Sequence, residues 1–263
     1  MSNRGTETLD SGAPRRAFAS SLAQCLVRGA RHALPQRCAL CAAASGGELL
    51  CTACAGELPH IGTACPGCAL PALDAGLCGT CLSKPPPWSR ATAALIYAFP
   101  VDRLMVELKY GGRLALADWA GTALAAAVVA SLAARDGVAM PSRVAPVPLT
   151  ASRQRERGFN QALEIARRLA EQLALPLVAP LERVSASIPQ ATLAWRERAR
   201  NVRGAFAARG DVRGARIALV DDVMTTGATL AEAARTLLRA GAADVECWVV
   251  ARTLPPGAGH LAR

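Results

Sequence analysis

The chain has 263 residues, of which 52% are hydrophobic and only 4% aromatic, so it is a globular protein with enough apolar side chains for a core. Its length corresponds to about two domains of ordinary size. The charge is basic, with 30 Lys and Arg residues against 20 Asp and Glu residues. The longest apolar stretch, Leu114–Ala134, is rich in alanine and interrupted by Asp118, which favours a soluble helix and excludes a membrane span.

Residues 1–34 are predicted to form an N-terminal tail that includes one short amphipathic helix. Arg15 and Arg16 precede the apolar run Ala17–Val27, an order that also occurs in secretory and organellar leaders. The run is short and is broken by two serines and a glutamine, so we do not interpret it as a leader. We therefore expect a cytoplasmic protein without membrane insertion.

Four C-x-x-C pairs follow the tail. Nine, ten and nine residues separate the successive pairs, and Gly or Pro lies near them. A C-x-x-C turn points two sulfurs toward one point, so two turns supply the four thiolates of a tetrahedral zinc site. The segment therefore predicts two structural zinc ions with eight ligands: Cys38, Cys41, Cys51, Cys54, Cys65, Cys68, Cys78 and Cys81.

Disulfides and thioredoxin-like redox motifs are weaker interpretations of these pairs. Sulfurs this close in sequence rarely form good structural bridges, and no strand and helix pattern surrounds them. Sequential pairing gives two stacked ribbons and interleaved pairing a cross-brace; we expect sequential pairing, because shorter loops close at lower entropic cost. Eight thiolates and two zinc ions would lower the formal charge of +10 to about +6, a mildly basic surface that permits acidic ligands.

A proline-rich linker, Lys84–Trp88, ends the cysteine-rich segment, because consecutive prolines continue neither helix nor sheet. We place the domain boundary there. The predicted organisation is a tail at 1–34, a double zinc ribbon at 35–84, a larger domain at 88–254 and a C-terminal tail at 255–263.

Strands and helices alternate in the larger domain, which predicts a mostly parallel sheet covered by helices on both faces. The expected strands are Ala91–Ala98, Arg143–Val147, a short one near Leu177, Arg216–Val220 and Val245–Ala251. The expected helices are Val101–Tyr110, Leu114–Ala134, Asn160–Leu173 and Thr229–Ala240.

The loop after the strand Arg216–Val220 begins with Asp221 and Asp222, continues with threonines around Gly227, and leads into a helix. Unpaired N–H groups at a helix start, a glycine and hydroxyls form a cradle for a phosphate dianion. Adjacent carboxylates would repel phosphate, so they are expected to face sugar hydroxyls or Mg²⁺. The alternative from spacing alone is a capped helix with exposed turn acids; the cradle interpretation predicts a phosphorylated sugar ligand.

The complete string Asp221–Thr229 resembles the phosphoribosyl pyrophosphate (PRPP) signature of type I phosphoribosyltransferases. Together with the four C-x-x-C pairs, Arg157–Ala162 and Lys109–Gly112, the chain resembles the ComF family, proteins associated with DNA uptake in competent bacteria. The resemblance runs from about Pro35 to Arg252. It implies an α/β type I phosphoribosyltransferase fold with a parallel sheet, preceded by a small double zinc ribbon.

The resemblance also implies roles for single residues. Asp221 and Asp222 would hold the ribose hydroxyls, directly or through Mg²⁺, while Lys109 and Arg157 would contact the phosphate or pyrophosphate groups. These four are the catalytic candidates, and a surface ion pair is the alternative for Lys109. Purine-salvage members carry an Asp where this chain has Thr225, so a hypoxanthine-type reaction is doubtful. The residues implied to bind the 5′-phosphate are Thr225, Thr226, Gly227, Ala228 and Thr229.

A second, basic segment runs from Arg183 to Arg216 and contains eight Arg residues against Glu197 and Asp211. Within it, six residues from Gln190 to Phe206 resemble a second ComF pattern, at the position of the hood that closes over the reacting centre. Arginine suits either pyrophosphate or a nucleic-acid backbone. A solvated helix face is the alternative for any single one of these arginines.

Two functions remain open from the sequence. One is a phosphoribosyltransferase that binds PRPP with Mg²⁺ and acts on an acceptor that no residue identifies. The other is a non-catalytic accessory factor of DNA uptake and natural transformation, with a sensing or vestigial PRPP site, that contacts single-stranded DNA or competence proteins. The scarcity of aromatic residues speaks against a strong surface for base stacking.

Overall fold

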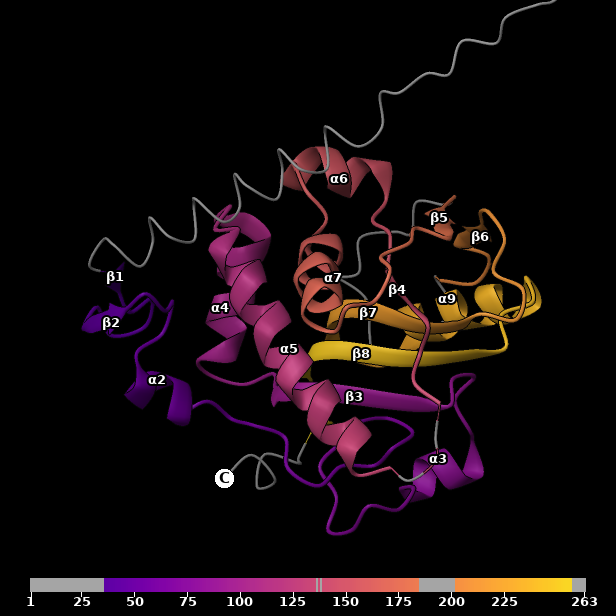
Figure 1. Ribbon diagram of the computed structural model, residues 1–263, viewed down its shortest axis with the longest axis horizontal. Coiled ribbons are helices and arrows are strands. Elements are labelled where there is room, and N and C mark those ends of the chain that lie inside the picture. Colours follow the sequence, from indigo (N-terminus) through magenta and orange to yellow (C-terminus); the bar gives the residue numbers. More distant parts are fainter. Residues whose placement is uncertain (1–35, 136, 138, 185–201, 257–263) are drawn as a thin grey trace, which may run out of the picture. The chain divides into compact units, whose positions relative to one another are not determined.

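The computed structural model describes residues 36–256 apart from residues 136, 138 and 185–201 (Figure 1). The predicted N-terminal helix, most of the C-terminal tail and half of the basic segment lie outside the described residues. The chain divides into two compact units, Met1–Glu57 and Leu58–Arg263. The first set of four cysteines belongs to the first unit, and the second set belongs to the same unit as the large sheet.

The first unit contains two very short strands, β1 (Gln36–Arg37) and β2 (Ala44–Gly46), which pair antiparallel. The helix α2 (Thr52–Gly56) follows Cys51 directly. Among the described residues of this unit, such short elements bury little apolar surface, which is typical of a segment stabilised by a metal.

The second unit is built on a four-stranded parallel sheet with the order β3, β8, β7, β4. The predicted parallel sheet is confirmed. Side chains of the two central strands are buried along most of their length, which is typical of a sheet covered on both faces. The strands are β3 (Arg90–Ile96), β4 (Arg143–Pro146), β7 (Arg216–Met224) and β8 (Asp244–Arg252).

Helices cover both faces of this sheet. In Figure 1 α5 and α7 lie in front of the strands and α9 lies behind them. By length and composition alone α5 could cross a membrane, but its buried residues pack against α7 and the sheet, as in a core helix. The helices are α4 (Val101–Tyr110), α5 (Ala115–Ala133), α6 (Ala151–Arg157), α7 (Gln161–Gln172) and α9 (Ala228–Arg239).

The segment before the sheet runs along the open edge of β3. Backbone hydrogen bonds join Ile96 to Pro59 (2.7 Å), Ile61 to Ala94 (3.1 Å), and the N–H of Ala91 to the carbonyl of Pro66 (2.8 Å). This segment therefore covers an edge that would otherwise offer unpaired backbone groups. It leads into α3 (Gly79–Ser83). A separate two-stranded hairpin, β5 (Leu181–Arg183) and β6 (Phe206–Ala208), flanks the undescribed residues 185–201.

The structure differs from the predicted elements at several places, and the hairpin of β5 and β6 is one that was not predicted. Strand β7 continues to Met224, so Asp221 and Asp222 lie within the strand and not in the loop after it, because β8 is equally long and supplies partners as far as Arg252. The helix α6 was not predicted, since it buries no side chain and has no apolar period. The short strand near Leu177 is a single bridge to Val144.

Candidate functional site

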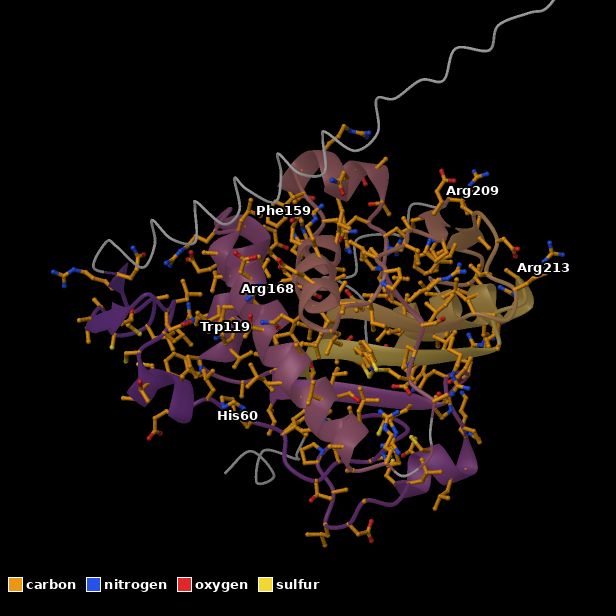
Figure 2. The ribbon with its side chains drawn as sticks, viewed as in Figure 1. His60, Trp119, Phe159, Arg168, Arg209 and Arg213 are labelled. Carbon is orange, nitrogen blue, oxygen red and sulfur yellow. The ribbon has the colours of Figure 1, made fainter. Side chains whose placement is uncertain are left out.

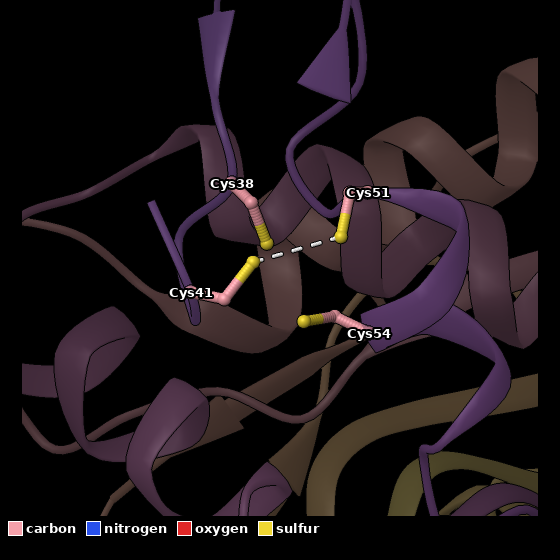
Figure 3. Close-up of side chains that lie close together, drawn as sticks. All are labelled: Cys38, Cys41, Cys51 and Cys54. Atoms are coloured by element: carbon pink, nitrogen blue, oxygen red, sulfur yellow. Dashed lines mark hydrogen bonds between the residues drawn. The ribbon is translucent and has the colours of Figure 1, made fainter. Parts of the chain in front are cut away.

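The four cysteines of the first unit form one cluster, in which all Sγ atoms lie within 4.8 Å of one another. Figure 3 shows these side chains turned toward a common centre, with the Sγ atoms of Cys41 and Cys51 separated by 3.7 Å. Tetrahedral zinc with Zn–S bonds near 2.3 Å places its sulfurs about 3.8 Å apart. The donor set therefore fits one structural zinc ion with no open position. The cluster consists of Cys38, Cys41, Cys51 and Cys54.

The second cluster repeats this arrangement with Cys65, Cys68, Cys78 and Cys81. The Sγ atoms of Cys68 and Cys78 are 3.7 Å apart, and the N–H of Cys78 donates to Cys65 Sγ (3.2 Å). Burial acts to raise the pKa of Cys65, but the backbone N–H groups of Cys78, Gly67 and Cys68 outweigh it and lower the pKa to about 7. A thiolate available near neutral pH is the form that binds zinc. The predicted sequential pairing is the pairing in the structure.

A cavity of about 350 Å³ opens where β3, β4 and β7 end, a size typical of small-molecule sites. Ligands of open α/β sheets bind at this end of the strands. Its wall combines acidic, basic and amide side chains from several elements. It includes Tyr97, Lys109, Val147–Leu149, Arg153, Arg157, Asn160–Ala162, Arg183, Asp221–Val223, Thr225 and Thr229.

An acid pair and a lysine meet on one side of this cavity. Lys109, in the last turn of α4, forms an ion pair with Asp222 (Nζ to Oδ2, 2.8 Å). Burial acts to lower the pKa of Lys109, but the charge and hydrogen bond of Asp222 and the charge of Asp221 raise it overall. Desolvation and the charge of Asp222 raise the pKa of Asp221 to about 7. The charges of Lys109 and Arg183 lower the pKa of Asp221, but they do not offset burial and the charge of Asp222. The two adjacent carboxylates are thus in surroundings that favour a further cation.

The loop after β7 leads directly into α9. Gly227 has φ +75° as the N-cap residue, a left-handed conformation that glycine adopts without strain. The first N–H groups of a helix have no helical acceptor, and the Thr226 hydroxyl accepts from Ala228 (3.2 Å). This leaves the N–H groups of Thr229 and Leu230 for a ligand. A small hollow lined by Asp221 and residues 223–230 lies at this loop.

The Arg157–Ala162 motif forms the opposite wall. Gly158 ends α6 with φ +77°, and Asn160 caps α7 while its side-chain N–H donates to Val147 O (3.1 Å). Arg157 donates to Gln161 Oε1 (3.1 Å) and lies over the Tyr110 ring. Within the described residues, the buried Nε of Arg157 and Nε2 of Gln161 have no acceptor. Buried donors without partners are rare, so this wall is suited to an anionic ligand.

The structure brings the sequence-predicted residues Asp221, Asp222, Lys109 and Arg157 to one cavity. Of the predicted phosphate residues, Thr225 and Thr229 line this cavity and Thr225, Thr226, Gly227, Ala228 and Thr229 all line the hollow beside it. Sequence reasoning gave no role to Tyr97, Asn160 or Gln161. For Tyr97 a signal was present, since a polar residue at the carboxyl end of a parallel strand is a candidate contact.

The arginines after β6 behave differently from those of the cavity. In Figure 2 Arg209 and Arg213 extend outward from the second unit. They form ion pairs with Glu182 and Asp211, and their side chains are 66% and 82% exposed. Arg209 and Arg213 therefore agree with the alternative in which arginines of the basic segment are solvated surface residues. Arg183, which belongs to the same segment, lines the cavity.

The comparisons with known proteins agree with this architecture. The phosphoribosyl transferase domain model matches residues 126–256, and the double zinc ribbon domain model matches residues 30–82. The DNA utilization protein YhgH of Escherichia coli (strain K12) is 38% identical over 225 residues, which cover 84% of this chain and 99% of that protein. Competence protein F of Haemophilus influenzae is 32% identical over 184 residues, which cover 66% of this chain and 78% of that protein.

Among solved structures, a purine phosphoribosyltransferase from Pyrococcus horikoshii matches with a TM-score of 0.32 and 19% identity. The match covers 53% of this chain and 87% of that one.

Proposed function

The chain belongs to the ComF family, with a double zinc ribbon and a type I phosphoribosyltransferase fold, and on that premise we propose that it binds PRPP or a related phosphoribosyl ligand with Mg²⁺. Because the relatives are named for DNA utilization and competence, we place this function in DNA uptake.

One observation carries the proposal: a single cavity joins two adjacent acids, a lysine, three arginines and the start of a helix. PRPP presents the matching groups, namely a 5′-phosphate, a ribose with vicinal hydroxyls, and a pyrophosphate. Each group of the ligand therefore has a chemically suitable partner in the same wall.

In this arrangement the loop Thr225–Thr229 holds the 5′-phosphate through backbone N–H groups and hydroxyls. Asp221 and Asp222 face the ribose hydroxyls and Mg²⁺, a hard cation that prefers oxygen ligands. Arg157, with its unsatisfied Nε, faces the pyrophosphate together with Arg153.

Lys109 has two successive roles, one without the ligand and one with it. Without ligand it neutralises Asp222, to which it is bonded. A bound Mg²⁺ would be held by Asp221 and Asp222 and would supply charge neutralisation for the leaving pyrophosphate. The amine of Lys109 would then be available to the same pyrophosphate, where a positive charge stabilises the transition state.

Turnover needs an acceptor, and the hypoxanthine type is disfavoured because Thr225 stands where purine-salvage members carry Asp. A non-catalytic sensor that binds PRPP and contacts single-stranded DNA is the second candidate. The names of the relatives support it, whereas Arg209 and Arg213 in local ion pairs do not.

The test is calorimetric titration of the full chain with PRPP, with and without Mg²⁺. We expect Mg²⁺-dependent binding that the double substitution Asp221→Asn and Asp222→Asn abolishes. The matched control is Asp244→Asn, a carboxylate at the opposite end of β8 that is paired with Arg216. Unaltered PRPP affinity in the double variant, or no binding by the wild type, would overturn the proposal.

A second measurement separates the two candidates. Release of pyrophosphate on addition of a panel of nucleobases and amines supports the transferase. Binding of PRPP without turnover, together with single-stranded DNA binding that weakens steeply with salt, supports the accessory factor.

A further inference from the structure

Arg252, the last residue of β8, is a buried cation outside the cavity just described, with 6% of its surface exposed. Its Nη1 donates to the carbonyls of Met224 (3.0 Å), Thr225 (2.5 Å) and Thr253 (2.8 Å). Its Nε donates in the other direction, to the carbonyl of Cys68 (2.7 Å). The loop Thr225–Thr229 is called the phosphate loop below. One guanidinium thus bonds both to this loop and to the turn that carries two ligands of the second cysteine cluster.

The charge of Arg252 has a partner in that cluster. Four thiolates around one zinc ion carry a net charge of about −2, and Cys68, Cys81 and Cys78 all act electrostatically on the guanidinium. A buried cation is stable only when it is paired and hydrogen-bonded. The thiolates of the cluster pair with the charge of Arg252, and the four carbonyls accept its hydrogen bonds.

Trp88 makes a second connection between the same two regions. Its indole N–H donates to the carbonyl of Gly67 (2.7 Å), inside the turn between Cys65 and Cys68. The far side of the ring lies beside the phosphate loop, because a Cβ added at Gly227 would be 3.2 Å from its Cη2 atom. The side chain is 8% exposed and belongs to the core cluster on the α9 side of the sheet.

Both connections start from the same short turn. The carbonyls of Gly67 and Cys68 lie in the turn whose first and last residues are zinc ligands, so the metal fixes where these carbonyls point. Both connections also lead to the phosphate loop: Arg252 bonds to the carbonyls of Thr225 and of Met224, which directly precedes the loop, and the Trp88 ring lies beside Gly227. The geometry of the metal centre therefore reaches the loop through two rigid planar groups.

We propose that Arg252 and Trp88 are positioning residues that couple the second zinc centre to the phosphate loop, so that zinc at this centre is required for binding of a phosphorylated sugar. The inference rests on the proposed function of the loop. Linkage makes the coupling reciprocal: occupation of the loop by a phosphate must raise the affinity of the second centre for zinc.

The first experiment titrates ribose 5-phosphate into the full chain and into Trp88→Phe and Arg252→Lys. Phenylalanine keeps the ring but removes the donor to Gly67, and lysine keeps the charge but loses the planar fork. We expect each variant to bind on the order of tenfold more weakly, within the usual range of coupling between sites.

Matched controls separate positioning from general loss of stability. Trp119→Phe changes a tryptophan of α5, labelled in Figure 2, and Arg135→Lys changes a buried arginine that pairs with Glu246 (2.6 Å). Both controls are expected to keep the affinity of the wild type for ribose 5-phosphate, even where the melting temperature falls.

The second experiment measures the release of zinc at equilibrium, in titrations with a coloured chelator with and without ribose 5-phosphate. In the wild type we expect the sugar phosphate to raise the chelator concentration that removes one of the two zinc ions, and Cys51→Ser, which removes a ligand of the first cluster, assigns the protected ion to the second. Arg252→Lys is expected to lose this protection, a result that a merely structural role of Arg252 does not produce.

The outcomes distinguish this inference from the proposed function. If the wild type binds no ribose 5-phosphate or PRPP, the proposed function fails. If the wild type binds, but the two variants bind equally well or zinc release is independent of the sugar phosphate, the coupling is refuted and the proposed function stands.

Discussion

At the scale of single residues, Asp221 shows how the candidate site works against the stability of the fold. Its carboxyl group lies against Asp222 in a desolvated part of β7, and its pKa rises to about 7 from an ordinary value of 3.8. A group held in this way favours its neutral form without a ligand. Ionisation of Asp221 therefore opposes folding until a cation or sugar hydroxyls satisfy the charge.

The contribution of Asp221 to the stability of the ligand-free protein should accordingly fall as the pH rises from about 4 to about 7, because the unfolded chain loses this proton first. Above about pH 7 the loss is complete and stays constant. Asp221→Asn removes it, so we expect the variant to be more stable at pH 8 by about 1 to 4 kcal/mol, with a smaller gain at pH 5. Urea unfolding at both pH values measures the difference.

Asp244→Asn serves as the control for this prediction, because Asp244 is paired with Arg216 and should give no such gain. A gain in Asp221→Asn that is the same at pH 5 and pH 8 would contradict the assignment.

At the scale of elements, the joint between β7 and α9 depends on a glycine for two separate reasons. Gly227 has φ +75°, and a Cβ there would lie 3.2 Å from Trp88 Cη2. Gly112, between α4 and α5, has φ +65° with nothing within 4 Å of the same position. The two residues share the backbone conformation and differ in what surrounds it.

Alanine substitutions at these two positions separate the cost of the left-handed backbone conformation from the cost of crowding against Trp88. We expect Gly112→Ala to lower the free energy of unfolding by about 1 kcal/mol, the cost of a left-handed residue with a Cβ. Gly227→Ala should lower it further, because Trp88 has to shift. Chemical denaturation of both variants checks the order, and equal losses would mean that the indole moves away without strain.

At the scale of the whole molecule, the two zinc centres stand in different relations to the sheet. The first belongs to a compact unit that ends at Glu57 and the second to the unit that starts at Leu58. The proline-rich linker was proposed as the boundary from sequence, yet backbone hydrogen bonds join the segment before it to β3.

Zinc analysis and calorimetry of two variants test this division. Cys51→Ser and Cys78→Ser should each reduce the zinc content from two ions per chain to one. We expect only Cys78→Ser to lower the melting temperature of the sheet, by about 4 °C or more. A sheet that melts at the same temperature in both variants would support the predicted boundary at the linker.

The local patterns of the sequence determined much of this protein. The spacing of the cysteines was sufficient to predict two four-cysteine centres with sequential pairing, because a C-x-x-C turn is a short-range structure. Apolar runs alternating with helical segments were sufficient for the parallel sheet, since each period reports its own element. The resemblance of Asp221–Thr229 to the PRPP signature marked the strand end and helix start that form the candidate site.

Only the tertiary structure decided which distant groups meet. Lys109 and Asp222 form an ion pair, and Arg252 reaches both Cys68 and Thr225, although these residues are far apart in the chain. The length of β7 was likewise set by its neighbour β8 rather than by its own residues. Such contacts follow from how strands and helices pack, and packing depends on the shape of the whole unit, which no short stretch of sequence carries.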